Sequence, residues 1–547
     1  MHLRPFLESL VRVLVPFAFL ATTYLYLYPI FHGCAFPSTN RSGTTAFRST
    51  FQQHVRPLVG PSAPADAQLA PFRLLVLADP QLEGDSSLPD PENGFFHRLA
   101  GHWARLKNGP TLANMDTASD ILQTLLFRDI PEALQALRKR LDLFGNDFYL
   151  AHIYRTMHWW AKPTHITVLG DLIGSQWVDD EEFEWRGWRY WNRVFTGGER
   201  IDDSITHQYQ QEGEKLLNMD DEAWQRRIVN IAGNHDIGYA GDISKSRIER
   251  FERVFGKANW DVRLQYPMPS NGVESSSGLP TLHVVVLNDL NLDTPALDEE
   301  LQGQTYEYLN SLITDRVRPV EDPFDFTLVL THVPLHKKAG VCVDSPLFDF
   351  WGSDDGGGAY KPHGVKEQYH LSDHASHSGV LEALFGMSGN MEAPAQGKGR
   401  NGLILTGHDH EGCDVWHYIP RNSTIHGTSE EKESTTTVWE ASRWEETDMD
   451  AAHTGIREVT LRSMMGDFGG NAGLLSAWFD FGEKEWKYDI VMCKLGVQHI
   501  WWAIHTLDLV AIALAVLLLM GRYARSPTSN ESMVSGPPLR VKGTKQE

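Results

Sequence analysis

Positive charge is scarce in this sequence of 547 residues. Its 71 acidic side chains outnumber the 49 basic ones, so the formal net charge is −22 at pH 7. This balance argues against nucleic acid or an anionic membrane surface as the main partner. Single-sign runs of the kind that mark acidic tails are absent, and so are internal repeats. The excess of acidic residues is explained equally by solubility and by a role in substrate choice.

Cysteine is also rare, because the chain has only four. Cys34 and Cys493 lie just inside two apolar stretches near the chain ends, whereas Cys342 and Cys413 each follow an apolar run further in. Spacing alone does not decide between disulfides and free buried thiols. If this part of the chain faces an oxidising compartment, we expect Cys342 and Cys413 to pair.

Two apolar stretches bracket the chain. Residues 13–31 carry no charge, and at about 1.5 Å per residue they nearly cross a hydrocarbon core of about 30 Å. A signal peptide is the alternative, although its apolar region is usually only about 7–15 residues long. Residues 500–520 are also long enough to span a membrane, and Trp501 and Trp502 fit an interfacial belt. Asp508 interrupts this second stretch, either near the interface or paired with His505.

Basic residues outside the two stretches predict the orientation of the chain. Arg4 and Arg12 precede or open the first stretch, and Arg522 and Arg525 follow the second. Cytoplasmic flanks of membrane spans carry an excess of Lys and Arg, so both termini are predicted to be cytosolic. The long middle segment is then expected in the lumen of the secretory pathway.

Asn40 and Asn422 each begin a glycosylation triplet, which agrees with a lumenal middle segment. The predicted organisation is a cytosolic arm (1–12), a transmembrane helix (13–31), a lumenal linker (33–70), a lumenal domain (71–495) with insertions near 82–160, 352–379 and 388–402, a second transmembrane helix (500–520) and a cytosolic tail (521–547).

Five short apolar or β-type runs are followed by residues that bind metal ions or transfer protons. The runs cover residues 72–78, 165–169, 226–229, 326–330 and 403–406, and each predicts a strand. Helical periodicity between strands, as in residues 118–143, indicates an α/β layered architecture. The polar residues that follow the runs are Asp79 and Gln81, then Asp171, then Asn234, His235 and Asp236, then His332, and finally His408 and His410. One such strand end is common, but five predict ligands that converge on a single two-metal centre.

Other segments carry weaker expectations. Residues 82–110 are expected to form a polar loop, and residues 179–195 a surface helix with a buried aromatic stripe. Later strands are expected near residues 437–439, 458–462, 476–481 and 486–492. Because no helices separate these strands, we expect them to complete a second sheet.

The ligand types indicate the chemistry. Two metal ions about 3.5–4 Å apart need a bridging ligand, and a carboxylate with two oxygens can bridge them. Asp171, at a tight strand end after a glycine, is the predicted bridge. We expect one metal to be completed by Asp79, His410 and Gln81, and the other by Asn234, His332 and His408. Mixed carboxylate, amide and imidazole ligands suit Mn, Zn or Fe better than calcium or a thiolate zinc site.

His235 is the predicted general acid for a leaving alkoxide, with Asp236 fixing the tautomer of its ring. The attacking group would be a water whose pKa the cations lower. His336, Lys337 and Lys338 are candidates for phosphate contacts, although exposed lysines are more often solvated surface.

Residues 352–379 form a long loop rich in glycine, aspartate and histidine. Its histidines, His363, His370, His374 and His377, show no tight ligand spacing. The loop is therefore predicted to be a mobile lid rather than a third metal site.

The signatures D-x-[HQ], G-D, G-N-H-D, T-H-x-P-L and G-H-x-H, in this order, resemble those of the calcineurin-like metallophosphoesterase superfamily. The resemblance covers about residues 72–415. It implies an α/β fold in which a two-sheet β-sandwich is flanked by helices, with a dinuclear Mn, Fe or Zn centre. Gln81 departs from the pattern, because most members have a metal-binding histidine there, which puts this ligand in doubt.

A narrower resemblance rests on A-D-P-Q, G-H-D-H-E-G-C-D, the late run R-S-M-M-G-D-F-G-G-N-A-G and the flanking membrane spans. These are similar to fungal members of the endoplasmic-reticulum phosphoesterases that remodel GPI anchors. The resemblance implies removal of ethanolamine phosphate from a mannose of the GPI glycan, which supports ER-to-Golgi export of anchored proteins. It also implies two divalent ions, with Mn expected and Zn or Fe as alternatives, and a GPI-anchored protein or GPI lipid as substrate. The expected location is the membrane of the endoplasmic reticulum or early Golgi, with the ER cargo-export machinery as a partner.

Acidic residues such as Asp289, Asp354 and Asp355 could favour an ammonium group on the substrate, although solvated surface acids are the simpler interpretation. The ligands serve any phosphoryl ester, so a phosphomonoesterase or a pyrophosphatase stays open as an alternative. A membrane cargo receptor without turnover is the third hypothesis.

Overall fold

The computed structural model describes residues 3–39, 50, 54, 69–84, 86, 88, 98–108, 114–206, 216–267, 278–342, 347–355, 358–420, 439–447 and 452–523. The chain forms two compact units, one made of Met1–Tyr26 with Trp501–Glu547 and the other of Leu27–Ile500. The glycosylation sites predicted at Asn40 and Asn422, and residues 524–547 of the predicted tail, lie outside the described residues.

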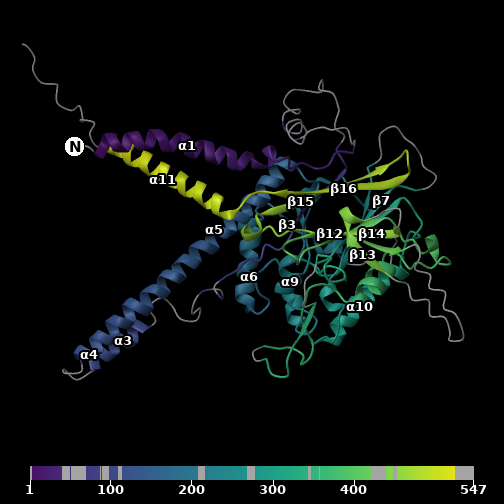
Figure 1. The fold of residues 1–547 in the computed structure, drawn as a ribbon, viewed down its shortest axis with the longest axis horizontal. Coiled ribbons are helices and arrows are strands. Elements are labelled where there is room, and N and C mark those ends of the chain that lie inside the picture. Colours follow the sequence, from purple (N-terminus) through teal and green to yellow (C-terminus); the bar gives the residue numbers. More distant parts are fainter. Residues whose placement is uncertain are drawn as a thin grey trace, which may run out of the picture. The chain divides into compact units, whose positions relative to one another are not determined.

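Two extended β-sheets form the centre of the larger unit within the described residues (Figure 1). The first sheet has the order β16-β15-β1-β2-β5-β3, with bounds Glu485–Lys494, Asn471–Asp480, Phe72–Leu77, His165–Val168, Arg227–Asn230 and Glu199–Arg200. The second has the order β13-β12-β14-β11-β8-β7-β6-β4, with bounds Glu440–Arg443, Cys413–Pro420, Ala452–Thr460, Gly402–Thr406, Asp325–Leu330, Thr281–Val286, Trp260–Gln265 and Leu216–Asn218. A small antiparallel pair joins β9 (Phe348–Phe350) to β10 (Val365–Gln368).

The hydrophobic core lies between the two sheets. Phe72, Leu74 and Val76 of β1 belong to one buried cluster with residues of β7, β8 and β11 from the other sheet. Alternate residues of a strand point to opposite faces, so Leu75 and Leu77, which are also buried, face the other side. A strand that is buried on both faces reads as a continuous apolar run, which is why β1 was recognisable from the sequence.

Helices flank the sheets in the larger unit, with α6, α9 and α10 along one side in the view of Figure 1. Their bounds are Arg98–Asn108 (α3), Asn114–Thr124 (α4), Ile130–Ala161 (α5), Asp180–Arg189 (α6), Asp203–Thr206 (α7), Asn234–Ile237 (α8), Lys245–Phe255 (α9) and Glu299–Thr314 (α10). π-helical turns cover Leu125–Asp129 (η2), Tyr190–Val194 (η3) and Ala375–Glu382 (η6). Single 3-10 turns cover Glu222–Gln225 (η4), Asp289–Asn291 (η5), Pro394–Gly397 (η7), Trp444–Glu446 (η8) and Gly466–Phe468 (η9).

The strands at the five ligand positions, the two-sheet α/β architecture and the apolar terminal helices agree with the predictions, whereas several other segments differ. The expected polar loop 82–110 contains α3, and the helix expected at 118–143 extends as α4, η2 and α5 from Asn114 to Ala161. Its apolar stripe is exposed, because this part of α5 extends away from the sheets (Figure 1): Leu134, Leu137, Leu141 and Phe144 are each at least 50% accessible. The late strands also divide between the sheets, since β13 and β14 join the second sheet and β15 and β16 the first.

The segment 179–195 is helical, as expected, but its aromatic side chains divide between the core and the surface. Phe183 and Tyr190 are buried. Trp185 and Trp188 are about half exposed and stack on each other, with ring centroids 4.9 Å apart.

The smaller unit pairs α1 (Leu3–Phe31) with α11 (Gln498–Tyr523), and both helices are long and apolar enough to cross a membrane. The helix starts at Leu3, so most of the expected arm 1–12 is helical. The hydroxyl of Thr22 on α1 donates to Asp508 Oδ2 on α11 at 2.7 Å. This contact differs from the predicted pairing of Asp508 with His505, because the partner comes from the other helix.

Candidate metal centre

All the predicted ligands lie at one end of the two sheets. Strands β1, β2 and β5 run parallel in the first sheet, and β8 and β11 run parallel in the second, so the carboxyl ends of each set share an edge. Backbone hydrogen bonds join the strand ends, from Gln81 N to Asp171 O at 2.9 Å and from Gly407 N to His332 O at 3.1 Å. This arrangement brings residues together from positions more than three hundred residues apart. We call this set of side chains the Asp171 centre: Asp79, Gln81, Asp171, Asn234, His332, His408 and His410.

Four acceptor atoms converge in one half of the Asp171 centre. The His332 ring places Nδ1 2.8 Å from the carbonyl of Leu169, so Nδ1 carries the proton of the neutral ring and Nε2 is the nitrogen that offers a lone pair once the ring is neutral. That Nε2 lies 3.0 Å from Asn234 Oδ1 and 3.3 Å from Asp171 Oδ1. His408 likewise donates from Nε2 to the carbonyl of Gln368 at 2.8 Å, so its Nδ1 faces Asn234 Oδ1 at 2.9 Å. Lone pairs so close to one another repel unless a cation lies among them.

The other half contains Asp79, Asp171 and His410, whose candidate ligand atoms lie within 4.8 Å of one another. Asp171, His332 and His408 form a second group by the same measure, so Asp171 is shared. The Gln81 amide donates from Nε2 to Asp171 Oδ2 at 3.0 Å and lies 3.2 Å from His410 Nε2. Rotating this amide by 180° would instead offer Oε1 to a cation. The grouping follows the division into two metal sites that we expected from the sequence.

Backbone conformation at the Asp171 centre is unusual. Asp79, Gln81, Asp171 and His408 have φ of 51°, 41°, 51° and 70°, the left-handed region that residues other than glycine rarely adopt. Such strain costs about 1–3 kcal/mol per residue and is concentrated at functional sites. The fold therefore maintains an unfavourable backbone to aim these side chains.

Two glycines allow the strand ends to approach one another. A Cβ on Gly233 would lie 2.0 Å from the amide nitrogen of Asp171, and a Cβ on Gly170 would lie 2.2 Å from Nδ1 of His332. Steric clashes thus explain why the G-N-H-D and G-D signatures require glycine at these positions. Any larger residue would force the two halves of the centre apart.

The electrostatics of the Asp171 centre favour bound cations. Burial raises the pKa of Asp79 well above its ordinary value, and nearby Asp171 raises it further. Asp79 Oδ2 is buried without a hydrogen-bond partner. Burial lowers the pKa of His332, but Asp171 and Asp79 raise it to about 10. Isolated carboxylates and imidazoles are costly to bury together, and divalent cations would neutralise the charge and satisfy the unpaired atom. The residues present therefore fit divalent metal ions.

His235 lies at the open side of the Asp171 centre. Its side chain is 38% exposed, whereas those of Asp171 and His332 are 2% and 0% exposed. Its Nε2 is 3.8 Å from Asp171 Oδ2, and its backbone N–H donates to Asp171 Oδ1 at 2.8 Å. His235 is thus partly open to solvent beside the buried carboxylate of Asp171.

Asp236 does not orient the His235 ring, which corrects our expectation. Its carboxylate is buried and accepts hydrogen bonds from the backbone N–H groups of Gly233, Leu172 and Ile173, at 2.8, 3.1 and 3.0 Å. These bonds tie the G-N-H-D turn to the residues that follow Asp171. Asp236 therefore holds two ligand loops in register.

The late run 462–473 supports the centre in a way that the sequence reasoning missed. Ser463 donates from Oγ to the carbonyl of Asp79 at 3.0 Å and from its backbone N–H to the carbonyl of His410 at 3.1 Å. Asn471 donates to the carbonyl of Ser463 at 3.0 Å, and the Phe468 ring packs edge-on against His410 with centroids 4.8 Å apart. The available signal was the motif itself, to which we had assigned no role.

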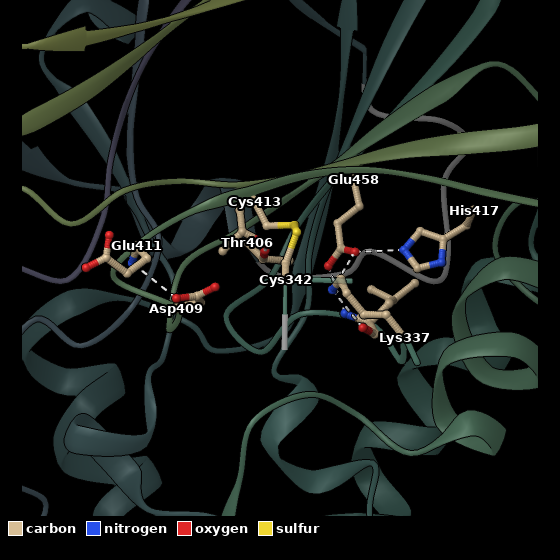
Figure 2. Close-up of a disulfide and its surroundings, with 10 residues drawn as sticks. Lys337, Cys342, Thr406, Asp409, Glu411, Cys413, His417 and Glu458 are labelled. Carbon is tan, nitrogen blue, oxygen red and sulfur yellow. Dashed lines mark hydrogen bonds and ion pairs between the residues drawn. A yellow bond between two sulfur atoms is a disulfide. The ribbon is translucent and has the colours of Figure 1, made fainter. Parts of the chain in front are cut away.

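The segment after His332 is anchored by a buried ion pair. Glu458 of β14 accepts from the backbone N–H of Leu335 at 2.8 Å, and from Lys337 and His417 at 3.0 and 2.7 Å (Figure 2). Lys337 is only 2% exposed, so it is neither a phosphate contact nor solvated surface, in contrast to Lys338, which is exposed. The ion pair fixes the T-H-x-P-L segment against the second sheet.

A disulfide fastens the two histidine-bearing loops to each other. Cys342, ten residues after His332, is bonded to Cys413, three residues after His410 (Figure 2). The pairing confirms the prediction, and Cys34 pairs with Cys493. The Cys342–Cys413 bond is partly exposed, whereas Cys34 and Cys493 are buried.

The expected lid at 352–379 has more structure than we predicted. It contributes β10 and the start of η6, and the carbonyl of Gln368, at the end of β10, accepts the bond from His408. Asp289 is buried and accepts from the backbone N–H of Val333 at 3.0 Å, so it is not available to an ammonium group. Asp355 accepts from the backbone N–H of Gly352 at 2.8 Å.

Several known proteins have sequences similar to that of this chain. No family model matches the chain. Protein TED1 of Saccharomyces cerevisiae is 32% identical over 400 residues, covering 66% of this chain and 75% of TED1. An uncharacterized protein of Schizosaccharomyces pombe is 27% identical over 63% of this chain and 65% of its own length. Metallophosphoesterase 1 of Mus musculus is 22% identical over 58% of this chain and 66% of its own length.

Among solved structures, "GAP50 the anchor in the inner membrane complex of Plasmodium" aligns over 79% of this chain and 90% of its own, with 10% identity and a TM-score of 0.26, and nothing is inferred from it. The family assignment rests on the sequence relatives, because TED1 is more than 30% identical over three quarters of its length. Together with the buried histidine and aspartate groups of the Asp171 centre, they show that the chain belongs to the metallophosphoesterase family that includes TED1 and metallophosphoesterase 1.

Proposed function

We propose that this protein is a phosphodiesterase with two divalent ions that removes ethanolamine phosphate from a mannose of the GPI-anchor glycan. The observation that carries the dinuclear assignment is the shared carboxylate of Asp171, which belongs to both groups of candidate ligands. The substrate assignment rests on the A-D-P-Q, G-H-D-H-E-G-C-D and late glycine-rich runs, which resemble those of the GPI-remodelling enzymes.

The chain's own residues perform three tasks in this proposal. Asp79, Gln81 and His410 would hold one ion, Asn234, His332 and His408 the other, and Asp171 would bridge them. When bound, two divalent ions offset charge on phosphoryl oxygens and lower the pKa of water. Manganese is our proposed metal, with zinc or iron as alternatives, because the donor set mixes carboxylate, amide and imidazole.

His235 donates the proton to the departing sugar oxygen. Its exposed ring lies beside the shared carboxylate, so a phosphodiester that enters from the open side meets Nε2 first. General acids of this kind contribute about 10²–10⁴-fold to the rate.

The two apolar helices give the proposed location. A chain that crosses the membrane at both ends of its folded unit stays near lipid-linked substrates, which suits a GPI anchor better than a diffusing metabolite. The proposed orientation places the Asp171 centre in the lumen of the endoplasmic reticulum or early Golgi. GPI-anchored proteins and the ER cargo-export machinery are the proposed partners.

The test uses purified full-length protein and GPI intermediates that differ only in which mannose carries ethanolamine phosphate. We expect release of ethanolamine phosphate from one intermediate, and mass spectrometry should show that cells lacking the protein accumulate anchors with the extra group. The variant His235→Gln is the matched control, because it should bind the same substrate and turn it over slowly. Unaltered glycans in the deficient cells would exclude this substrate. Release of inorganic phosphate from monoesters or pyrophosphate instead would assign a different phosphoesterase, and absence of any turnover would favour a cargo receptor.

A further inference from the structure

An apolar stripe along the outer part of α5 is exposed. It consists of Leu134, Leu137, Leu141 and Phe144, each at least half exposed, and we call it the α5 stripe. A helix has about 3.6 residues per turn, so spacings of three and four residues place these side chains on one face. Large apolar side chains that gather on an exposed face mark a surface that contacts a partner. The α5 stripe therefore indicates an interaction surface.

The opposite face of α5 is turned toward the rest of the larger unit. Lys139 pairs with Glu83 at 2.6 Å, and Glu132 pairs with Arg98 of α3 at 2.9 Å. Lys139 and Glu132 lie on the side of the helix away from the α5 stripe, because successive residues are about 100° apart. These contacts show which face of α5 is directed at its neighbours, and the α5 stripe is on the other face.

At its inner end the α5 stripe continues into the two exposed tryptophans of α6. The guanidinium carbon of Arg193 lies 5.7 Å from the centroid of the Phe144 ring. It also lies 5.9 and 5.7 Å from the rings of Trp185 and Trp188, and Arg193 is held by Asp147 at 3.1 Å. Tryptophan is enriched where a membrane meets water, because its ring is apolar and its N–H is a donor. The tryptophan pair thus extends the same surface with a residue type that favours a lipid boundary.

The inner end of α5 is also bonded to the residues that lead into the second apolar helix. The hydroxyl of Tyr149 donates to the carbonyl of Gly496 at 2.7 Å, and Nε2 of Gln498 donates to Asn146 Oδ1 at 3.4 Å. Gln498 is the first residue of α11. At about 1.5 Å per residue, the whole α5 stripe lies within about 18 Å of Asn146 along the helix. The stripe therefore starts beside the point where the chain enters its second membrane helix.

The first apolar helix is tied to the same place. Cys34, three residues after the end of α1, forms the buried disulfide with Cys493, five residues before α11 begins. A bilayer that both helices cross would end close to these residues. A lipid surface is therefore the partner that the chain itself brings next to the base of α5.

We propose that the α5 stripe, together with Trp185 and Trp188, lies in the headgroup region of the membrane that α1 and α11 cross. Helices of this kind bury their apolar face about 5–10 Å into the boundary between headgroups and acyl chains. Arg138 and Arg140 are exposed on either side of the stripe, and their stems can cover apolar surface while the guanidinium groups reach phosphate. The net charge of −22 opposes attraction to anionic lipid, so entry depends on the apolar side chains and phosphatidylcholine suffices. Because a disulfide joins the two membrane helices at one place, this third contact would fix the tilt of the larger unit against the membrane.

The test uses full-length protein in phosphatidylcholine vesicles, with the photoreactive residue benzoylphenylalanine in place of Leu137 or of Leu141. On illumination, both positions should crosslink to phosphatidylcholine that carries an alkyne tag. Gln135 is the matched position, because it is exposed on the same helix but lies on another face. Lipid labelling at positions 137 and 141 should exceed that at position 135 several-fold. No activity is measured, so the result is independent of the proposed function.

A second measurement needs no photoreactive residue. In vesicles whose acyl chains carry bromine, the double variant Trp185→Phe with Trp188→Phe should show a smaller quenched fraction of tryptophan fluorescence than the unsubstituted protein. Trp177→Phe is the control, because Trp177 is exposed to a similar extent but packs against Arg247, and it should not lower the quenched fraction. Equal thermal midpoints show that the variants are folded.

Three results would overturn the proposal. Equal lipid labelling at positions 135, 137 and 141, or none at any of them, would show that the stripe does not face lipid. Crosslinks between two copies of the chain at positions 137 and 141 would assign the stripe to a dimer interface, and crosslinks to another protein in microsomes would assign it to that partner. Unchanged quenching in the double tryptophan variant would show that α6 does not reach the membrane.

Discussion

Replacement of Glu458 by glutamine tests how the segment after His332 is held. The glutamine keeps an acceptor for the backbone N–H of Leu335, so the change removes mainly the charge that faces Lys337 and His417. Both Glu458 and Lys337 are buried, so Lys337 would be left without its counter-charge. The expected result is a less stable protein.

The stability that Glu458→Gln should lose can be worked out in two ways. Burial raises the pKa of Glu458, but Lys337 and then His417 lower it from 4.5 to about 2, and a tenfold change in proton affinity is about 1.4 kcal/mol, so the difference is about 3 kcal/mol. Breaking a buried ion pair by removing one partner costs about 3–5 kcal/mol. The unfolding entropy of a unit of this size is about 1 kcal/mol/K, so the thermal midpoint of Glu458→Gln should fall by about 3–5 °C.

The same ion pair predicts a dependence on pH. The folded-state pKa of Glu458 is lower than its unfolded value, so the stabilisation is complete above about pH 4.5 and is lost as the pH falls toward 2. The difference in midpoint between the unsubstituted protein and Glu458→Gln should therefore be constant between pH 6 and 8 and narrow below pH 4.5.

Tryptophan fluorescence during heating in detergent is the assay. Glu411→Gln is the control, because Glu411 pairs with Arg462 at 3.0 Å but is 72% exposed and should shift the midpoint by less than about 1 °C. Adding Lys337→Met to Glu458→Gln should recover part of the lost stability, since no buried charge is then unpaired. A midpoint for Glu458→Gln within 1 °C of the unsubstituted protein at pH 7 would refute this reasoning.

Three further predictions concern the Asp171 centre and its disulfide. Asp171→Asn should lose metal and activity together, and His235→Gln should keep its metal by elemental analysis while turnover slows about 10²–10⁴-fold; two retained ions in Asp171→Asn would mean that another residue bridges. Gln81→His should strengthen metal binding about tenfold or more, measured by chelator competition, because an imidazole replaces the amide beside Asp171; unchanged affinity would show that the amide already binds metal as well as a histidine does. Cys342→Ser should cost about 2–5 kcal/mol of stability and weaken metal binding, because it frees the loops that Cys413 holds together; unchanged thermal midpoint and metal content would contradict this role.

Strand ends were predictable because residues adjacent to them in the sequence indicate where each strand stops. Buried strands such as 72–77 and 165–168 are mostly apolar, and each is followed within two residues by a glycine or an aspartate with positive φ. Metal ligands were predictable for the same reason, since their residue types follow directly on the strands. The residue types that indicate metal binding and the strand ends that place them therefore lie in the same short stretches of sequence.

The interactions that support the Asp171 centre were not predictable, because they depend on contacts between distant segments. Nothing near Lys337 in the sequence reveals that Glu458 lies beside it, and a lysine pair looks like surface. Asp236 has a histidine next to it, yet its carboxylate is occupied by backbone groups of the neighbouring strand end. The exposed stripe of α5 misled the interpretation in another way, because periodicity shows that a helix has an apolar face and not what covers it.

The pairing of β1 with β15 has a consequence for the order in which the protein is made. Phe72 lies opposite Ala477, so β1, which ends two residues before Asp79, completes its hydrogen bonds only after the ribosome has passed residue 477. Ser463, which holds the carbonyl of Asp79, also comes late. A nascent chain interrupted before residue 463 therefore lacks the hydrogen bond from Ser463 to the carbonyl of Asp79, although β1 already pairs with β2 and the backbone N–H of His408 donates to Asp79 Oδ1. Vectorial synthesis thus delays the last backbone support of the Asp171 centre until the final strands of the larger unit have emerged.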